Sequence, residues 1–138
     1  MKKTKRLINL VILMLLALAL TIPSCKKDET NLSKKEMLTA KSWKILSSKT
    51  NGIAETFDDC QKDDFLTFAT NGNYTFNPGT IKCDAIETIE TGTWTLSSDE
   101  KFLIVDGESI TIIELSSNRF TFSLKDGDYT FEATYISF

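Results

Sequence analysis

Residues 119–138 read RFTFSLKDGDYTFEATYISF, and the alternation within them indicates the fold class. Apolar and aromatic side chains alternate with polar ones on both sides of Asp126-Gly127, the pattern of strands with one buried and one wet face. The apolar positions are Phe120, Phe122 and Leu124 before the turn, and Tyr129, Phe131, Ala133 and Tyr135 after it. Because Asp-Gly between two alternating runs favours a tight turn, the stretch predicts an antiparallel hairpin.

The same signals continue back along the chain to Ser42. Strand-forming residues alternate with polar ones, and turn residues recur every 8–14 positions, a spacing typical of an all-β sandwich or barrel. The predicted strands cover 43–50, 64–70, 73–77, 90–97, 102–106, 109–115, 119–124 and 129–138. The connections after residue 90 are short, so neighbours in sequence should pair antiparallel. We therefore expect an all-β fold, a small eight-stranded up-and-down barrel without exposed edges.

A short helix should precede the first strand. Ser33 and Glu36 have the spacing of a capping box, in which each side chain satisfies a backbone donor of the other residue. Leu32, Met37 and Leu38 supply a small apolar face. We predict a helix over 33–41 that covers or flanks the barrel.

The N-terminal segment has the form of a secretory signal peptide. Four basic residues between Lys2 and Arg6 precede an apolar run from Leu7 to Leu20, and those 14 residues are short of the about 20 that a membrane span needs. Thr21-Ile22-Pro23-Ser24-Cys25 then resembles the lipobox of bacterial lipoproteins, although proline is unusual at its place. The resemblance implies that Cys25 receives a diacylglycerol, that cleavage before it makes it the first mature residue, and that acyl chains such as palmitate anchor it.

The chain thus divides into a signal peptide (1–24), a tether (25–31) and one domain (32–138). The mature chain keeps 12 basic and 19 acidic residues, a net charge of 12 − 19 = −7, which argues against nucleic acid as a partner. Membrane attachment must therefore come from the lipid on Cys25. Lys26-Lys27-Asp28-Glu29 resembles the signal that exports Bacteroidota lipoproteins to the cell surface, although any tether could carry such mixed charges.

A set of ordered motifs carries a second resemblance. It consists of Leu38 with Ser42-Trp43, Asp58 to Asp64 around Cys60, Phe68 with Asn71-Gly72-Asn73-Tyr74, Gly79 to Cys83, and Glu90 to Trp94. Together they resemble the lipocalin-like domain of Bacteroidota lipoproteins over roughly residues 36–136, which implies a small antiparallel barrel related to lipocalins. The Gly-x-Trp that opens lipocalins reads Lys41-Ser42-Trp43 here. The family's arginine on this tryptophan could only be Arg119, the single arginine of the mature chain.

The remaining cysteines are predicted to pair. With Cys25 acylated, Cys60 and Cys83 are the two left, and an exported domain meets conditions in which disulfides persist. Closing the loop between them would stabilise the fold by about 3.4 kcal/mol in the chain-entropy model. Two reduced buried cysteines are the alternative. A metal site would need more ligands, and the chain has no histidine.

The sequence lacks the residues and motifs on which the common catalytic mechanisms depend. Without histidine there is no Ser-His-Asp or Cys-His pair, and no glycine-rich phosphate loop is present. Asp58, Asp59, Asp63 and Asp64 could in principle perform acid–base work or hold calcium, but a solvated acidic loop is the better interpretation. We expect no enzyme activity, no cofactor and no metal.

The barrel interior is the remaining candidate site. An eight-stranded barrel is just wide enough either to be filled by side chains or to hold one small ligand. We expect a lipoprotein of the outer membrane that binds a small apolar or amphipathic molecule through inward aromatic residues. The candidates are Trp43, Trp94, Phe122, Phe131 and Tyr135. The alternative is a filled barrel that serves as a structural or protein-interaction module, docked to an outer-membrane partner through the acidic loop.

Overall fold

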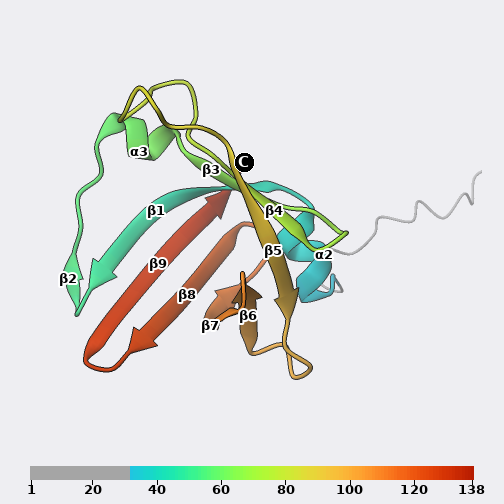
Figure 1. The fold of residues 1–138 in the computed structure, drawn as a ribbon. Helices are drawn as coiled ribbons and strands as arrows, with labels where there is room; N and C mark the ends of the chain where they lie inside the picture. Colours follow the sequence, from blue (N-terminus) through green and yellow to red (C-terminus); the bar gives the residue numbers. More distant parts are fainter. Residues whose placement is uncertain (1–31) are drawn as a thin grey trace, which may run out of the picture.

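The computed structural model describes residues 32–138, so the predicted signal peptide, Cys25 and the tether lie outside the described residues. Helix α2 (Lys34–Thr39) comes first, and a β-barrel follows (Figure 1). Its strands are β1 (Ser42–Thr50), β3 (Phe65–Phe68), β4 (Asn73–Asn77), β5 (Glu90–Leu96), β6 (Phe102–Val105), β7 (Glu108–Leu115), β8 (Arg119–Asp126) and β9 (Tyr129–Ser137).

These eight strands are the eight that the sequence predicts. Each pairs antiparallel with its neighbour in sequence, and β1 also pairs with β9, which closes the barrel. In the β8–β9 hairpin Phe120 lies opposite Tyr135, and Asp126 opposite Tyr129. Gly127 adopts a φ of +57°, a conformation that glycine adopts readily. The predicted all-β, up-and-down barrel with a short N-terminal helix is confirmed.

Two small elements were not predicted. Strand β2 (Ile53–Ala54) pairs with the end of β1 through a turn in which Asn51 and Gly52 have φ values of 51° and 81°. Helix α3 (Asp59–Asp63) occupies part of the segment expected to be an acidic loop. Its start is fixed by the Asp58 backbone N–H, which donates to the Gln61 side chain at 3.0 Å. Both elements are too short for a periodic pattern to reveal them.

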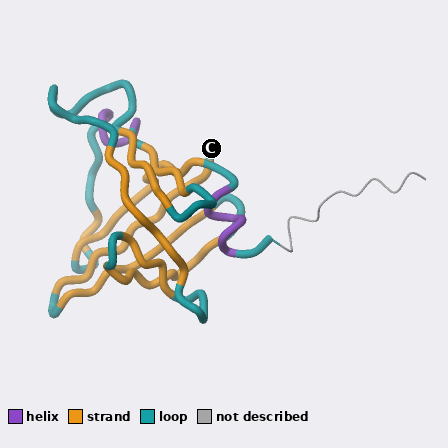
Figure 2. Tube along the Cα trace, turned by 45° about the vertical axis from the view of Figure 1, so that its right-hand side comes forward, coloured by secondary structure: helices purple, strands orange, loops and turns teal. Residues whose placement is uncertain are grey.

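The barrel has two different ends. The closed end carries α2 and the connections 69–72, 97–101 and 116–118, while the open end carries β2, α3 and the connections 78–89, 106–107 and 127–128. Figures 1 and 2 show the two helices at opposite ends of the barrel. At the closed end the Ser33 hydroxyl accepts from the Glu36 N–H, the predicted capping box. The Trp43 indole N–H donates to the Leu38 carbonyl at 3.0 Å, which ties α2 to β1.

The apolar core fills the closed half of the barrel. Its buried members are Leu38, Trp43, Phe68, Trp94, Leu103 and Phe120. Trp43 meets Phe120 edge-on at 5.9 Å between ring centroids, and Phe68 meets Trp94 at 5.3 Å. Burying each such side chain contributes about 1.5–3 kcal/mol, so this cluster is a main source of stability.

The arginine expected on Trp43 is not there. Trp43 is fully buried, with Phe120 and Leu38 as its partners, whereas Arg119 is exposed. Because successive residues of a strand point to opposite faces, the inward position of Phe120 places Arg119 on the outer face. The expectation of a Trp43–Arg119 contact was wrong for this reason.

Candidate functional site

The open end is held together by the predicted disulfide. Cys60 of α3 is bonded to Cys83 in the connection between β4 and β5, with 5.3 Å between their Cα atoms. The Asp63 carboxylate adds to this tie because it accepts the backbone N–H groups of Thr80 and Ile81, the latter at 2.8 Å. These hydrogen bonds lower the pKa of Asp63. Helix α3 and the 78–89 connection therefore form one linked flap beside the barrel mouth.

The barrel is hollow between the core and the open end. An interior cavity of about 300 Å³ lies on the open side of the core, which supplies Phe68, Leu103 and Phe120 to its floor. Strands β3 to β9 all contribute to its wall. The other lining residues are Leu66, Tyr74, Phe76, Glu90, Val105, Ile110, Phe122 and Tyr135. This volume is at the lower end of the range for small-molecule sites, and its wall is mainly apolar.

A second cavity of about 180 Å³ adjoins the first and is called the mouth cavity here. Phe76 and Tyr135 line both cavities, so the two spaces are neighbours on either side of these side chains. The mouth cavity lies between β1, β9 and the segment that contains α3. Its remaining lining residues are Ile45, Ser48, Glu55, Phe57, Gln61, Asp64, Phe65 and Phe131. Together the two cavities offer an apolar interior with a more polar entrance.

The carboxyl groups of the mouth cavity differ in their surroundings. Glu55 accepts hydrogen bonds from the Ser48 and Thr50 hydroxyls, both at 2.5 Å, which lowers its pKa. The pKa of Asp64 is raised, first by burial and then by the nearby negative charges of Glu87 and Asp63. Burial also raises the pKa of Tyr135, and Asp64 adds to this shift. The Asp64 carboxylate therefore lies close enough to Tyr135, which lines both cavities, for its negative charge to affect the pKa of the phenol.

Tyr74 is fixed at the side of the interior cavity. Its hydroxyl donates to the Asp106 carboxylate at 2.6 Å, and the Thr93 backbone N–H donates to the same carboxylate at 2.7 Å. The hydrogen bond to Asp106 raises the pKa of Tyr74 to about 12 and lowers that of Asp106. Three segments, β4, β5 and the β6–β7 turn, are thus joined at this wall.

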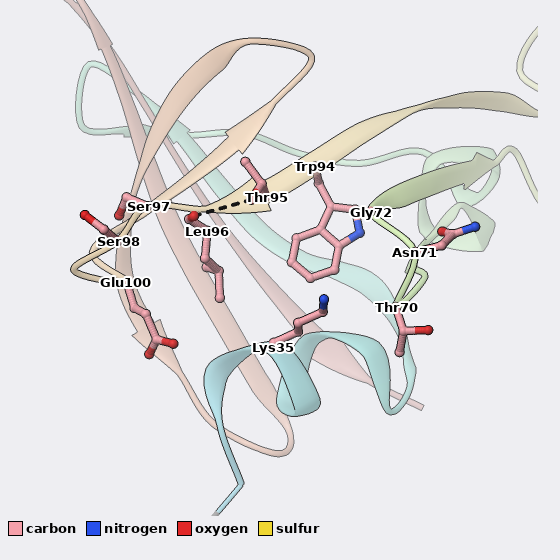
Figure 3. A pocket seen from close by; sticks show the side chains of 10 residues that line it. All are labelled: Lys35, Thr70, Asn71, Gly72, Trp94, Thr95, Leu96, Ser97, Ser98 and Glu100. Carbon is pink, nitrogen blue, oxygen red and sulfur yellow. Dashed lines mark hydrogen bonds between the residues drawn. The ribbon is translucent and has the colours of Figure 1, made fainter.

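A third cavity, of about 370 Å³, lies at the closed end beside α2 and is polar (Figure 3). Figure 3 shows Lys35 reaching from α2 toward the ring of Trp94, with Leu96 and the residues of the β5–β6 turn alongside. The indole N–H of Trp94 is already used, since it donates to the carbonyls of Ala69 and Asn73 at 3.0 Å each. This cavity is separated from the hollow half by the apolar core.

The five predicted ligand-binding residues fall into two groups. Phe122 lines the interior cavity, Phe131 lines the mouth cavity, and Tyr135 lines both. Trp43 and Trp94 instead belong to the core, and Trp94 also lines the polar cavity at the closed end. Sequence reasoning missed the lining residue Phe76, whose alternation with Asn73, Thr75 and Asn77 marks it as inward.

Neither a metal centre nor a membrane-spanning helix is found in the described part of the chain. Among residues 32–138 no group of three or more cysteine, histidine or acidic side chains is placed to hold a metal ion. Within the same range no helix has the length and apolar character needed to cross a membrane.

Comparison with known proteins agrees with this geometry. The family model of the lipocalin-like domain matches residues 39–122. The chain is also similar in structure to a crystallised lipocalin-like protein from Bacteroides uniformis, with a TM-score of 0.51 and 14% sequence identity. That likeness covers 74% of this chain and 99% of the other, and at this identity it concerns the fold alone. A comparison with curated proteins gave no match.

Proposed function

The chain belongs to the lipocalin-like domain family, and from that premise we propose that it is a lipid-anchored protein of the outer membrane, displayed at the cell surface, that binds a small apolar or amphipathic molecule inside its barrel. The observation that carries this proposal is the interior cavity of about 300 Å³. Its wall is apolar except for Tyr74, Glu90 and Tyr135, the composition of a site that binds by burial and orients its ligand through a few polar groups.

The proposed anchor is consistent with access to the barrel. The described chain begins at residue 32, just before α2 at the closed end. A tether of seven residues, 25–31, spans at most about 25 Å when fully extended. A diacylglycerol on Cys25 would therefore keep the closed end toward the membrane and leave the open end, with the mouth cavity, facing away from it.

We propose a binding role and not a catalytic one. The site offers carboxylates and phenols but no histidine, since the sequence contains none. In the described part of the chain no cysteine lines either barrel cavity. The Ser48 hydroxyl donates to the Glu55 carboxylate, but the lowered pKa of Glu55 makes it a weak base for activating a nucleophile.

Native mass spectrometry of protein purified from its own host tests the proposal. We expect a population whose mass exceeds that of the lipidated chain by one small molecule, and organic extraction should release that molecule. A barrel that is always ligand-free, and that takes up no apolar fluorescent probe after purification, would rule the binding role out.

A protein-interaction role is the second candidate, favoured by exposed apolar residues on the flap. Ile81, Ile86 and Ile89 are 54%, 81% and 58% exposed. The acidic residues of the neighbouring α3 segment could orient a partner on this surface. Crosslinking on cells, compared with a variant neutralised at Asp58, Asp59, Asp63 and Asp64, would test this role. Recovery of the same partners from both forms would exclude the acidic segment as the contact.

A further inference from the structure

The mouth cavity is built from aromatic rings and carboxylates. Five of its ten lining residues are aromatic, namely Phe57, Phe65, Phe76, Phe131 and Tyr135. Two more are acidic, Glu55 and Asp64. The faces of aromatic rings attract cations, most strongly where water is partly excluded. A wall of rings with two carboxylates therefore favours a positively charged group.

Among residues 32–138, no basic side chain lines either barrel cavity. The interior cavity adds a third carboxylate, Glu90, and its remaining lining is apolar or phenolic. A ligand with an anionic head would meet three carboxylates without a lysine or arginine in the wall to pair with it. Leaving a buried charge unpaired is costly, so the cavity disfavours anions such as fatty carboxylates.

Asp64 is available to such a ligand. Within residues 32–138 its carboxylate accepts no hydrogen bond, and its neighbours act on it only through burial and through the charges of Glu87, Asp63 and Lys82. The two like charges and the burial disfavour its ionised form, and a cation in the mouth cavity would relieve that penalty. Glu55 differs, because hydrogen bonds from Ser48 and Thr50 already favour its ionised form.

The distribution of charge between the two ends of the barrel also favours a cationic ligand. The four connections of the open end, 51–64, 78–89, 106–107 and 127–128, hold nine acidic residues and two lysines, a net charge of 2 − 9 = −7. The segments of the closed end, 32–41, 69–72, 97–101 and 116–118, hold four lysines and three acids, a net charge of 4 − 3 = +1. This asymmetry raises the local concentration of cations at the open end.

We propose that the barrel binds a cationic amphiphile. Its ammonium group occupies the mouth cavity, among the aromatic rings and beside Asp64 and Glu55, and its apolar tail extends past Phe76 and Tyr135 into the interior cavity. The inference rests on the proposed ligand-binding function and names the chemical class of the ligand. It depends on the charge of the head group and not on the tail alone.

Binding of octyl probes that differ only in their head group tests the proposal. Isothermal titration of the purified domain would compare octyltrimethylammonium, octylammonium, octanol and octanoate at low ionic strength. We expect both cations to bind about tenfold tighter than octanol, a difference of about 1.4 kcal/mol, and octanoate to bind most weakly. Tighter binding of octylammonium than of the quaternary probe would indicate a primary amine as the natural head group.

Charge-removing variants complete the test. Asp64→Asn with Glu55→Gln should reduce the affinity for both cations about tenfold and leave octanol binding within a factor of about two. Glu114→Gln, on the exposed outer face of β7, removes one negative charge away from the cavities. It should change neither the affinity for the cations nor the affinity for octanol. Equal binding of cations and octanoate, or a cation preference that survives the double substitution, would overturn the inference while octanol binding upholds the proposed function. Failure of all four probes to bind would overturn both.

Discussion

The Tyr74 hydroxyl donates a hydrogen bond of 2.6 Å to the Asp106 carboxylate and so joins β4 to the turn between β6 and β7. The pair adds to the hydrogen bonds between Asp106 and Thr93, in which the Asp106 backbone N–H donates to the Thr93 carbonyl at 2.9 Å. It therefore extends the attachment of this turn from β5 to β4. Both residues also stand near the interior cavity, since Tyr74 lines it and Asp106 fixes the phenol in place.

The hydrogen bond between Tyr74 and Asp106 predicts a specific pH dependence. The pKa of Asp106 is lowered in the folded state, so its contribution to stability is present above the unfolded pKa and is lost as pH falls through the folded one. The pKa of Tyr74 is raised to about 12, so its contribution is full below about pH 10 and is lost as pH rises toward 12. We expect Tyr74→Phe to remove the alkaline dependence and to reduce the acidic one, because the Thr93 backbone N–H still donates to Asp106. The pKa of Asp106 should rise in this variant, as measured by NMR titration. An unchanged Asp106 titration in this variant would contradict the assignment.

The disulfide between Cys60 and Cys83 should stabilise the fold without shaping the barrel. Replacing both cysteines with alanine removes a constraint on the unfolded chain, so the free energy of unfolding should fall by at most about 3.4 kcal/mol. The far-ultraviolet circular dichroism should not change, because the bond joins α3 to a connection and neither cysteine lies in a barrel strand.

A thiol titration checks the disulfide directly. Denatured protein from the cell envelope should show no free thiol at Cys60 or Cys83, and two should appear after reduction. Two titratable thiols before reduction would show that the bond does not form in the cell.

Filling the interior cavity should abolish ligand binding at little cost in stability. Ile110 of β7 lines the cavity of about 300 Å³, so Ile110→Trp places the added atoms in empty space. Enlarging a side chain in a filled core costs about 1–3 kcal/mol, and we expect less here. Ile113→Trp, on the same strand but 58% exposed, is the control and should leave binding intact. Thermal unfolding and probe titration measure the two effects, and a strong loss of stability with Ile110→Trp would mean that the space is not empty in solution.

The sequence predicts which residues face inward but not how far along the barrel they lie. Alternation places Trp43, Trp94, Phe122 and Tyr135 inside, and all four are at least partly buried. Their height along the barrel axis depends on the tilt and register of the strands, which a single strand's pattern does not contain. For this reason the two tryptophans, expected at a ligand site, lie in the closed-end core.

The sequence also could not predict that one half of the barrel is hollow. A cavity is a deficit of side-chain volume summed over many strands, and its seven contributing strands are spread over residues 65–137. The alternatives of a filled core and a ligand cavity were therefore both open. The structure contains each of them, with the core at the α2 end and the cavities at the α3 end.

The proposed anchor on Cys25 and the residues that follow it predict where the protein is found and which side of the membrane it faces. Cys25→Ser removes the thiol that would receive the diacylglycerol, so the protein should appear unlipidated in the inner-membrane or soluble fraction. Neutral residues in place of Lys27-Asp28-Glu29 should leave lipidation intact but keep the protein facing the periplasm. Protease added to whole cells measures the difference, because it reaches the exposed flap isoleucines only on a surface-displayed protein. If cleavage is unchanged in the second variant, those three residues do not direct export, while a lipid found on Cys25→Ser protein would remove the basis for the anchor itself.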